Sequence, residues 1–222
     1  MNSPEYPLRA SSILPMRAPE RLYAPFTDSA WIYEIKWDGW RCRAGFGGGL
    51  PVDMYTKRGM PCASWFPEVA EVLVRLPGGH WVVDGELCVL DSSGRSDFDR
   101  MQERASRRRW VPGMQVTFMA FDLLVREGRS VMQLPLLERK ALLKEALGTA
   151  GNTSVLYQSD LPAKAELLHE IAEPLGLEGF MAKKADSLYV PGERSENWRK
   201  IKTMSFLSRV RQRFRGRHRR GE

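Results

Sequence analysis

The chain has 222 residues, of which 43% are hydrophobic and 27% charged, a composition typical of a folded protein with one large core or two small lobes. It contains no run of about 18 apolar residues, so we expect no membrane span, and its first residues lack the layout of a secretory signal. The formal net charge is +7, but the segment 203–222 carries seven arginines and one glutamate, or +6, so residues 1–202 are nearly neutral.

The first half of the chain predicts mainly strands. Residues 1–30 are rich in Pro, Ser and Ala and predict an arm with little regular structure. Strand patterns follow at 31–38, 41–46 and 52–57, and the glycines at 45 and 47–49 are typical of a hairpin. Residues 67–76 predict a helix closed by two glycines, and residues 80–90 predict a strongly alternating strand.

The second half alternates helices with strands. Asp97 can cap a helix that runs to the basic cluster at 107–109, and the apolar run at 116–124 predicts a central strand. Asp160 and Pro162 predict the start of another helix. The remaining patterns predict a helix at 136–147 and strands at 155–158, 180–184 and 198–202. Non-repeating strands and long helices predict an α+β fold whose sheets meet around a cleft.

The stretch from Trp31 to Arg41 predicts a strand with one apolar and one charged face, because successive side chains alternate. The large apolar residues share one face: Trp31, Tyr33, Ile35 and Trp37. The charged residues share the other: Glu34, Lys36 and Asp38. A lysine between carboxylates above a hydrophobic floor is a candidate covalent nucleophile. The alternative is an edge strand with a salt-bridged, solvated face.

Three further groups of residues fit either a binding site or an ordinary structural role. Asp84 and Glu86 share a strand face that suits a ribose or a divalent cation, or is simply exposed. Lys200 and Lys202 share a face that suits a polyphosphate, or is a solvated surface. Phe121 is either a core residue or a ring that stacks on a base.

Together these groups describe a pocket for a nucleoside triphosphate, and the order of their motifs resembles that of the covalent nucleotidyltransferases. The motifs are Lys36-x-Asp38-Gly39-x-Arg41, Asp84-Gly85-Glu86, Phe121-Asp122, Glu178-Gly179-x-x-x-Lys183 and Lys200-x-Lys202. Residues 31–39 and 182–192 look closest to ATP-dependent DNA ligases, especially the ligase part of bacterial multi-domain end-joining ligases. The likeness covers about residues 20–202. It implies an adenylation domain with two antiparallel sheets, flanked by helices, around an ATP cleft.

The resemblance also implies a role for each matched residue. Lys36 would attack the α-phosphate of ATP, form a lysyl-AMP phosphoramidate and release pyrophosphate. Glu86 and Glu178 would place Mg²⁺, and Glu86 and Arg41 would contact the ribose. Glu34 would contact the adenine amino group, and Phe121 would stack on the base. Lys183, Lys200 and Lys202 would hold the phosphates. The full nucleotide-binding set is Glu34, Asp38, Gly39, Arg41, Glu86, Phe121, Lys183, Lys200 and Lys202.

The resemblance divides the chain into an arm at 1–20, an adenylation domain at 21–202 and an arginine-rich tail at 203–222. Family members carry an oligonucleotide-binding barrel after the lysine pair, and the 20 residues that follow Lys202 are too few for one. We therefore expect either that the arginine-rich tail supplies some DNA affinity or that a partner, a separate oligonucleotide-binding or end-binding protein, supplies the missing domain. The stretch Thr56-Lys57-Arg58-Gly59 resembles a family motif, with a lysine at its arginine position. The residues expected to bind DNA phosphates are Lys57, Arg58, Arg209, Arg211, Arg213 and Arg215.

The leading interpretation is an ATP-dependent, DNA ligase-like adenylyltransferase. It would pass AMP from Lys36 to a 5′-phosphate at a DNA nick or break, using ATP and Mg²⁺, in repair or recombination. One alternative is an RNA ligase or a capping-type nucleotidyltransferase, and another is a non-sealing, ligase-derived DNA-binding module. The cysteines at 42, 62 and 88 lack metal-ligand spacing and indicate reduced thiols in the cytoplasm.

Overall fold

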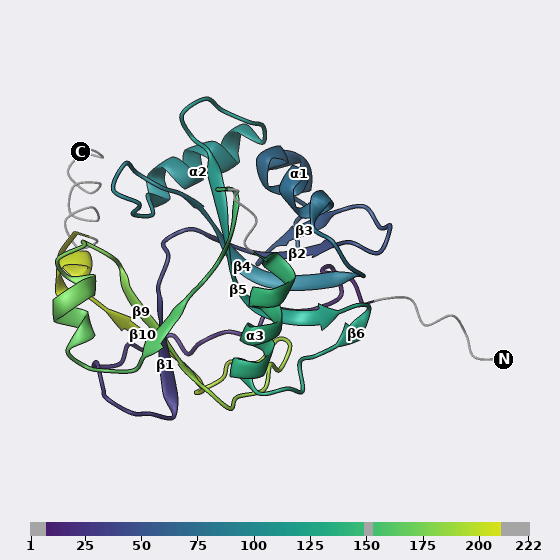
Figure 1. Cartoon of the computed structure of the whole chain (residues 1–222). Coiled ribbons are helices and arrows are strands. Elements are labelled where there is room, and N and C mark those ends of the chain that lie inside the picture. Colours follow the sequence, from purple (N-terminus) through teal and green to yellow (C-terminus); the bar gives the residue numbers. More distant parts are fainter. Residues whose placement is uncertain (1–7, 149–152, 210–222) are drawn as a thin grey trace.

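A computed structural model describes residues 8–148 and 153–209 of the chain as two β-sheets with helices packed around them (Figure 1). The smaller sheet has four strands in the order β10-β9-β1-β8, and every neighbouring pair in it is antiparallel. Its strands are β1 (Trp31–Ile35), β8 (Asp160–Pro162), β9 (Gly179–Lys184) and β10 (Trp198–Lys202).

The larger sheet has the order β3-β2-β4-β5-β6, and β7 pairs with β5 in parallel. Its strands are β2 (Trp40–Phe46), β3 (Asp53–Thr56), β4 (Trp81–Val89), β5 (Val116–Arg126), β6 (Arg129–Ser130) and β7 (Val155–Tyr157). The antiparallel sheets confirm the predicted fold class. The predicted hairpin is formed by β2 and β3, and β5 is the central strand that its apolar run indicated.

Three α-helices cover the larger sheet, with α1 and α2 at the top of the view and α3 in front (Figure 1). The Asp97 side chain accepts a hydrogen bond from the Arg100 backbone N–H, which confirms the predicted cap of α2. Between the sheet and these helices lies the largest hydrophobic core. The labelled helices are α1 (Pro67–Arg75), α2 (Phe98–Arg107) and α3 (Leu136–Leu147), with a short 3-10 helix η1 (Ala63–Trp65) and a short π-helix η2 (Leu168–Ala172). Residues 204–209 are also helical.

The described part of the N-terminal arm has little regular structure, yet it packs into a hydrophobic core. Ala10, Ile13 and Met16 are buried against Val82, Phe121 and other residues of the two sheets. Isolated β-bridges join Arg17 to Arg194 and Leu22 to Lys200. The arm therefore lies across both sheets and helps to hold them together.

Two predicted elements are wrong in part. The helix expected from Asp160 and Pro162 is instead strand β8, because these residues pair with β1, and helical residues appear only from Leu168. The strand expected at 31–38 ends at Ile35. Trp37 therefore leaves the buried face, lines a cavity and donates a hydrogen bond from its indole N–H to Gln158. Among the described residues, no helix is long and apolar enough to cross a membrane.

Candidate functional site

A cavity of about 290 Å³ lies where the two sheets and the N-terminal arm meet. Its lining comes from β1, β2, β4, β5, β9 and β10, which are distant in the sequence. The predicted residues that the fold brings together in this lining are Glu34, Lys36, Gly39, Arg41, Lys57, Glu86, Phe121, Lys183 and Lys200. Most of the residues selected from the motifs thus share one site.

Lys36 lies directly after β1 and is held by β9 and by Glu178. Its backbone N–H donates to Gly179 O at 2.9 Å, and its Nζ lies 2.8 Å from Glu178 Oε2. The second oxygen of Glu178 lies 2.7 Å from Lys202 Nζ. The Glu178 side chain is only 2% exposed, against 19% for Lys36. One buried carboxylate therefore bridges two ammonium groups and leaves the Lys36 amine at the cavity wall.

The floor of the cavity is built around Glu34, which is 2% exposed. Its Oε1 accepts a hydrogen bond from Lys140 Nζ at 2.6 Å, and its Oε2 lies 2.6 Å from Lys183 Nζ. Lys183 Nζ also lies 4.1 Å from the centre of the Phe121 ring. Burial lowers the pKa of Lys183, and nearby Glu34 opposes that shift. Glu34, Lys183 and Phe121 all line the cavity, so its floor is both charged and aromatic.

Lys140 is a residue of this floor that the sequence reasoning missed. It lies on α3, and its Nζ also donates to the Gln158 backbone carbonyl at 2.8 Å. Burial disfavours its charge, but Glu34 outweighs that effect and raises the pKa of Lys140. The sequence did contain a sign that Lys140 is buried, because it lies at helical spacing between the apolar residues Leu136 and Leu143, which are themselves buried. A lysine in an apolar stripe needs a buried partner.

Arg41 is fixed by Asp84 at the side of the cavity. Its Nε and Nη2 donate to the two oxygens of Asp84 at 2.7 and 2.6 Å, and Nη2 also donates to Met16 O at 3.0 Å. Tyr189 donates its hydroxyl proton to Asp84 Oδ2 at 2.6 Å. Asp84 is fully buried and does not line the cavity, so the alternative of a simply exposed face is wrong for this residue. Its charge is used to orient Arg41.

Glu86 lines the cavity, and burial raises its pKa to about 7, while Lys36 and Arg41 act in the opposite direction. On the opposite wall, partial burial and the charge of Lys36 lower the pKa of Lys200. Gly39 passes so close to β4 that a Cβ there would lie 2.2 Å from Leu87 O. The backbone approach at Gly39 therefore admits no side chain.

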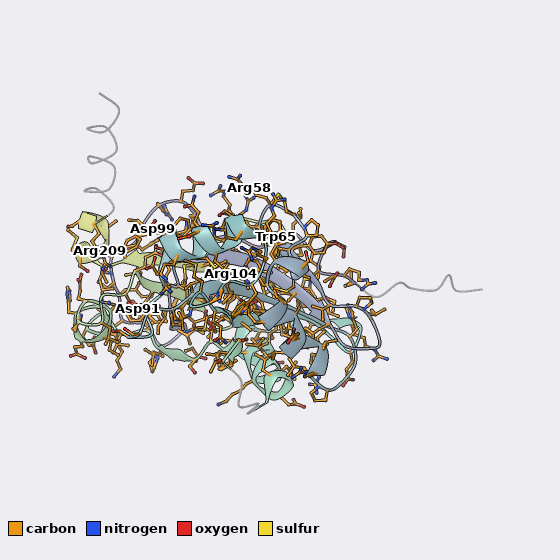
Figure 2. All side chains as sticks on the ribbon, turned by 90° about the horizontal axis from the view of Figure 1, so that it is seen from above. Arg58, Trp65, Asp91, Asp99, Arg104 and Arg209 are labelled. Carbon is orange, nitrogen blue, oxygen red and sulfur yellow. The ribbon has the colours of Figure 1, made fainter. Side chains whose placement is uncertain are left out.

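The other predicted residues lie beside the cavity or away from it. Asp38 and Glu178 line a smaller pocket of about 30 Å³ that also touches Lys36. Arg58 lies in the exposed turn after Lys57, and Arg209 donates to Gly176 O at 3.0 Å (Figure 2). The predicted DNA contacts at positions 211, 213 and 215, namely Arg211, Arg213 and Arg215, fall outside the described residues.

The arm and the segment before β10 supply lining residues that no motif indicated. Arg17 and Glu20 come from the arm, and Arg194 comes from the segment before β10. Arg194 Nη2 lies 2.7 Å from Glu20 Oε1 at the exposed rim. The arm has no periodic pattern, so nothing in its sequence linked these residues to the site.

The carboxylates fit Mg²⁺ only as part of a larger ligand set. In residues 8–148 and 153–209, no group of three or more His, Cys, Asp or Glu side chains could hold a metal ion. Both oxygens of Glu178 are engaged by ammonium groups. Mg²⁺ commonly uses one or two carboxylates together with substrate phosphates. Glu86 and Glu178 match that chemistry when a polyphosphate is present.

Comparison with known proteins finds relatives that match most of the chain. Residues 14–202 match the family model described as ATP dependent DNA ligase domain. The multifunctional non-homologous end joining protein LigD of Mycolicibacterium smegmatis is 34% identical over 194 residues, or 87% of this chain and 24% of LigD. DNA ligase C2 of the same organism is 38% identical over 170 residues, covering 73% of this chain and 47% of that ligase.

A solved structure also matches most of this chain. The structure described as mycobacterial DNA ligase D complexed with ATP and MES has a TM-score of 0.72 and 32% identity. The match covers 88% of this chain and 62% of that one. The chain spans about a quarter of the length of the LigD relatives that it matches.

Proposed function

Because the chain belongs to the family of ATP-dependent DNA ligase domains, we propose that it takes AMP from ATP onto Lys36 and passes it to a 5′-phosphate at a DNA nick or break. The observation that carries this proposal is the place of the Lys36 amine. It lies at the wall of a cavity with an aromatic, charged floor and further lysines, 2.8 Å from the buried Glu178 carboxylate.

In the first step, the Lys36 Nζ attacks the α-phosphorus of ATP. A phosphorus–nitrogen bond forms, and the bond to the β-phosphate oxygen breaks, so pyrophosphate leaves. The ammonium group loses one proton before the attack and the nitrogen loses a second after it. Glu178 Oε2 already accepts a hydrogen bond from this nitrogen at 2.8 Å, which makes it the nearest acceptor for the first proton.

The cavity floor favours adenine. Glu34 is a carboxylate, which only accepts hydrogen bonds when ionised, and the adenine amino group is a donor. Guanine presents a carbonyl oxygen at the corresponding position, which a carboxylate repels. Phe121 supplies a ring on which a base can stack. This preference supports ATP use and argues against the capping-type alternative, which uses GTP.

The remaining polar residues suit the sugar and the phosphates. We assign Arg41 and Glu86 to the ribose, and Lys183, Lys200 and Lys202 to the phosphates, because these lysines line the cavity or pair with Glu178 beside it. Lys57 is a further cation in the lining. Glu86 and Glu178 would hold Mg²⁺ with the ATP phosphates. When bound, the ion would offset negative charge on the leaving pyrophosphate.

Sealing a break requires more than the first step. The matched family region ends at Lys202. We propose that a DNA-clasping domain completes the reaction, whether it comes from a further part of the polypeptide or from a separate oligonucleotide-binding or end-binding protein. A reducing cytoplasm is part of this proposal, and the three free cysteines, Cys42, Cys62 and Cys88, are consistent with it.

The proposal is tested by incubating the chain with Mg²⁺ and α-labelled ATP, followed by denaturing electrophoresis. We expect an acid-labile label on the wild-type protein, none on Lys36→Ala, and full label on the exposed control Lys164→Ala. A label that survives in Lys36→Ala, or no label on the wild type, would contradict it. Nicked DNA with a 5′-phosphate, added next, would then receive the AMP, whereas nicked RNA would not.

A further inference from the structure

The C-terminal end of α2 exposes basic and aromatic side chains that have no part in the nucleotide cavity. Arg108 follows the helix in the left-handed region, with φ 51°, and its guanidinium lies 4.8 Å from the centre of the Trp65 ring. Trp110 is 50% exposed, which is unusual for so large an apolar side chain. We call this group the arginine–tryptophan surface: Trp65, Arg108, Arg109 and Trp110.

The positive charge of this surface is not neutralised by nearby acids. Arg104 is buried against Glu68 at 3.0 Å, and Arg107 pairs with Glu103 at 3.3 Å. Arg108 and Arg109 are exposed, and no carboxylate forms an ion pair with either of them within residues 8–148 and 153–209. Two uncompensated guanidinium groups therefore face solvent next to an exposed indole.

This combination suits a nucleic acid backbone. A guanidinium stacked on an aromatic ring keeps its N–H edge free to donate to phosphate oxygens. An exposed tryptophan beside cations can pack on a sugar or stack on a base. A protein partner would also use Arg and Trp, but it would need carboxylates at matching positions, whereas DNA carries a negative charge at every phosphate.

Trp65, the ring that Arg108 contacts, lies in the same half of the view as a predicted DNA contact that adjoins the cavity. Lys57 lines the cavity, and Arg58 is the next residue along the chain. Figure 2 shows Arg58 at the upper edge of the molecule and Trp65 below it, in the upper half of the view. A strand that presents its 5′-phosphate to the cavity can therefore continue past Arg58 toward α2.

We propose that the arginine–tryptophan surface binds the sugar–phosphate backbone of the DNA whose end reaches the nucleotide cavity. This inference rests on the proposed function and adds to it the place where the DNA runs. The surface increases affinity for DNA and takes no part in the reaction of Lys36 with ATP.

The test compares the full-length wild type with the Arg108→Ala/Arg109→Ala variant and with Trp110→Ala. Binding of a nicked duplex with a 5′-phosphate is measured by fluorescence anisotropy at several salt concentrations. We expect the double variant to bind about tenfold more weakly, and the slope of log K against log salt to fall by about 2 because two phosphate contacts are lost. Trp110→Ala should weaken binding with little change in that slope.

A matched control removes two exposed arginines elsewhere, Arg75→Ala/Arg129→Ala, which changes the net charge equally. Wild-type affinity in the double variant, or equal weakening in the control, would overturn the proposal. Self-adenylylation without DNA is measured on the same samples and should be unchanged. Loss of the label in every protein would count against the proposed function alone. Circular dichroism checks folding, and the single variant Arg109→Ala replaces the double one if it misfolds.

Discussion

At the scale of single residues, the site is ordered by buried carboxylates that lysines hold in place. Glu34 is contacted from two sides by Lys140 and Lys183, each at 2.6 Å. Glu178 bridges Lys36 and Lys202 in the same way. Each buried acid is compensated, so neither pays the large cost of an isolated buried charge. These ion pairs therefore orient both the hydrogen-bond acceptors and the nucleophile.

Replacing Lys140 by Met should weaken the preference for ATP over GTP. Glu34 would lose the hydrogen bond that orients its Oε1, so the adenine amino group would meet a less ordered acceptor. We expect the KM for ATP in self-adenylylation to rise about tenfold, with a smaller change in kcat. Unfolding should become easier by about 3 kcal/mol because a buried ion pair is broken.

The control for that variant is Lys144→Met, on the exposed face of the same helix. Lys140→Arg should restore part of the ATP preference, because it keeps a positive charge near Glu34. A general loss of stability would lower the rates with ATP and with GTP equally. An unchanged ratio of the two rates in Lys140→Met would therefore refute the orienting role.

Glu86 should make the stability of the nucleotide-free protein depend on pH. Its pKa is about 7 when folded, above the ordinary 4.5, so the folded state holds the proton more tightly. The free energy of unfolding should therefore fall as pH rises from about 4.5 to about 7. Glu86→Gln has no such proton to lose. Its free energy of unfolding should therefore rise by about 1–3 kcal/mol relative to that of the wild type as pH increases across that range. Urea unfolding at pH 5 and pH 8, without Mg²⁺, measures the difference, and parallel profiles would contradict it.

At the scale of elements, the site depends on the packing of segments that have no strong pattern of their own. Arg41 is held by Met16 O from the arm as well as by Asp84. Met16 N in turn donates to the Tyr189 hydroxyl at 2.9 Å. An irregular segment thus fixes a cavity residue through backbone groups, which neither side-chain periodicity nor motif spacing records.

Met16→Ala should destabilise the protein by about 2–4 kcal/mol, because the side chain is fully buried between the sheets. Its neighbour in the arm, Leu14, is 64% exposed, and Leu14→Ala should change stability by less than about 0.5 kcal/mol. Chemical denaturation of both variants measures the contrast. Equal effects would mean that the arm does not pack as described.

Elements formed by interactions between residues close in the sequence could be predicted, and those that depend on distant residues could not. Strands β4 and β5, helices α2 and α3 and the face shared by Glu34 and Lys36 were predictable, because local spacing determines them. Strand β8 was not, since pairing with β1 overrides the helix-start signal of Asp160. The Arg41–Asp84 and Glu34–Lys140 pairs join residues 43 and 106 positions apart, so only the fold reveals them.

At the scale of the whole molecule, the cavity is the place where the two sheets meet, and a nucleotide there touches both. Lys36 and Lys200 come from the smaller sheet and its edge, and Glu86 and Phe121 come from the larger. A ligand that binds only the folded protein adds about 2.7 kcal/mol to stability at 100 times its Kd. AMP attached covalently to Lys36 would keep this effect after free ATP is removed.

Reversibly bound ATP is removed by desalting, whereas AMP attached covalently to Lys36 stays on the protein. The protein is incubated with ATP and Mg²⁺, passed through a desalting column and melted, beside Lys36→Ala treated identically. We expect the wild-type Tm to stay raised by several degrees, because the AMP is held by a covalent bond and by contacts to both sheets. The Tm of Lys36→Ala should return to its nucleotide-free value, since reversible binding is lost on the column. If pyrophosphate is then added, reversal of the first step should bring the wild-type Tm back down. A wild-type Tm that falls on desalting would mean that no AMP had been transferred to Lys36.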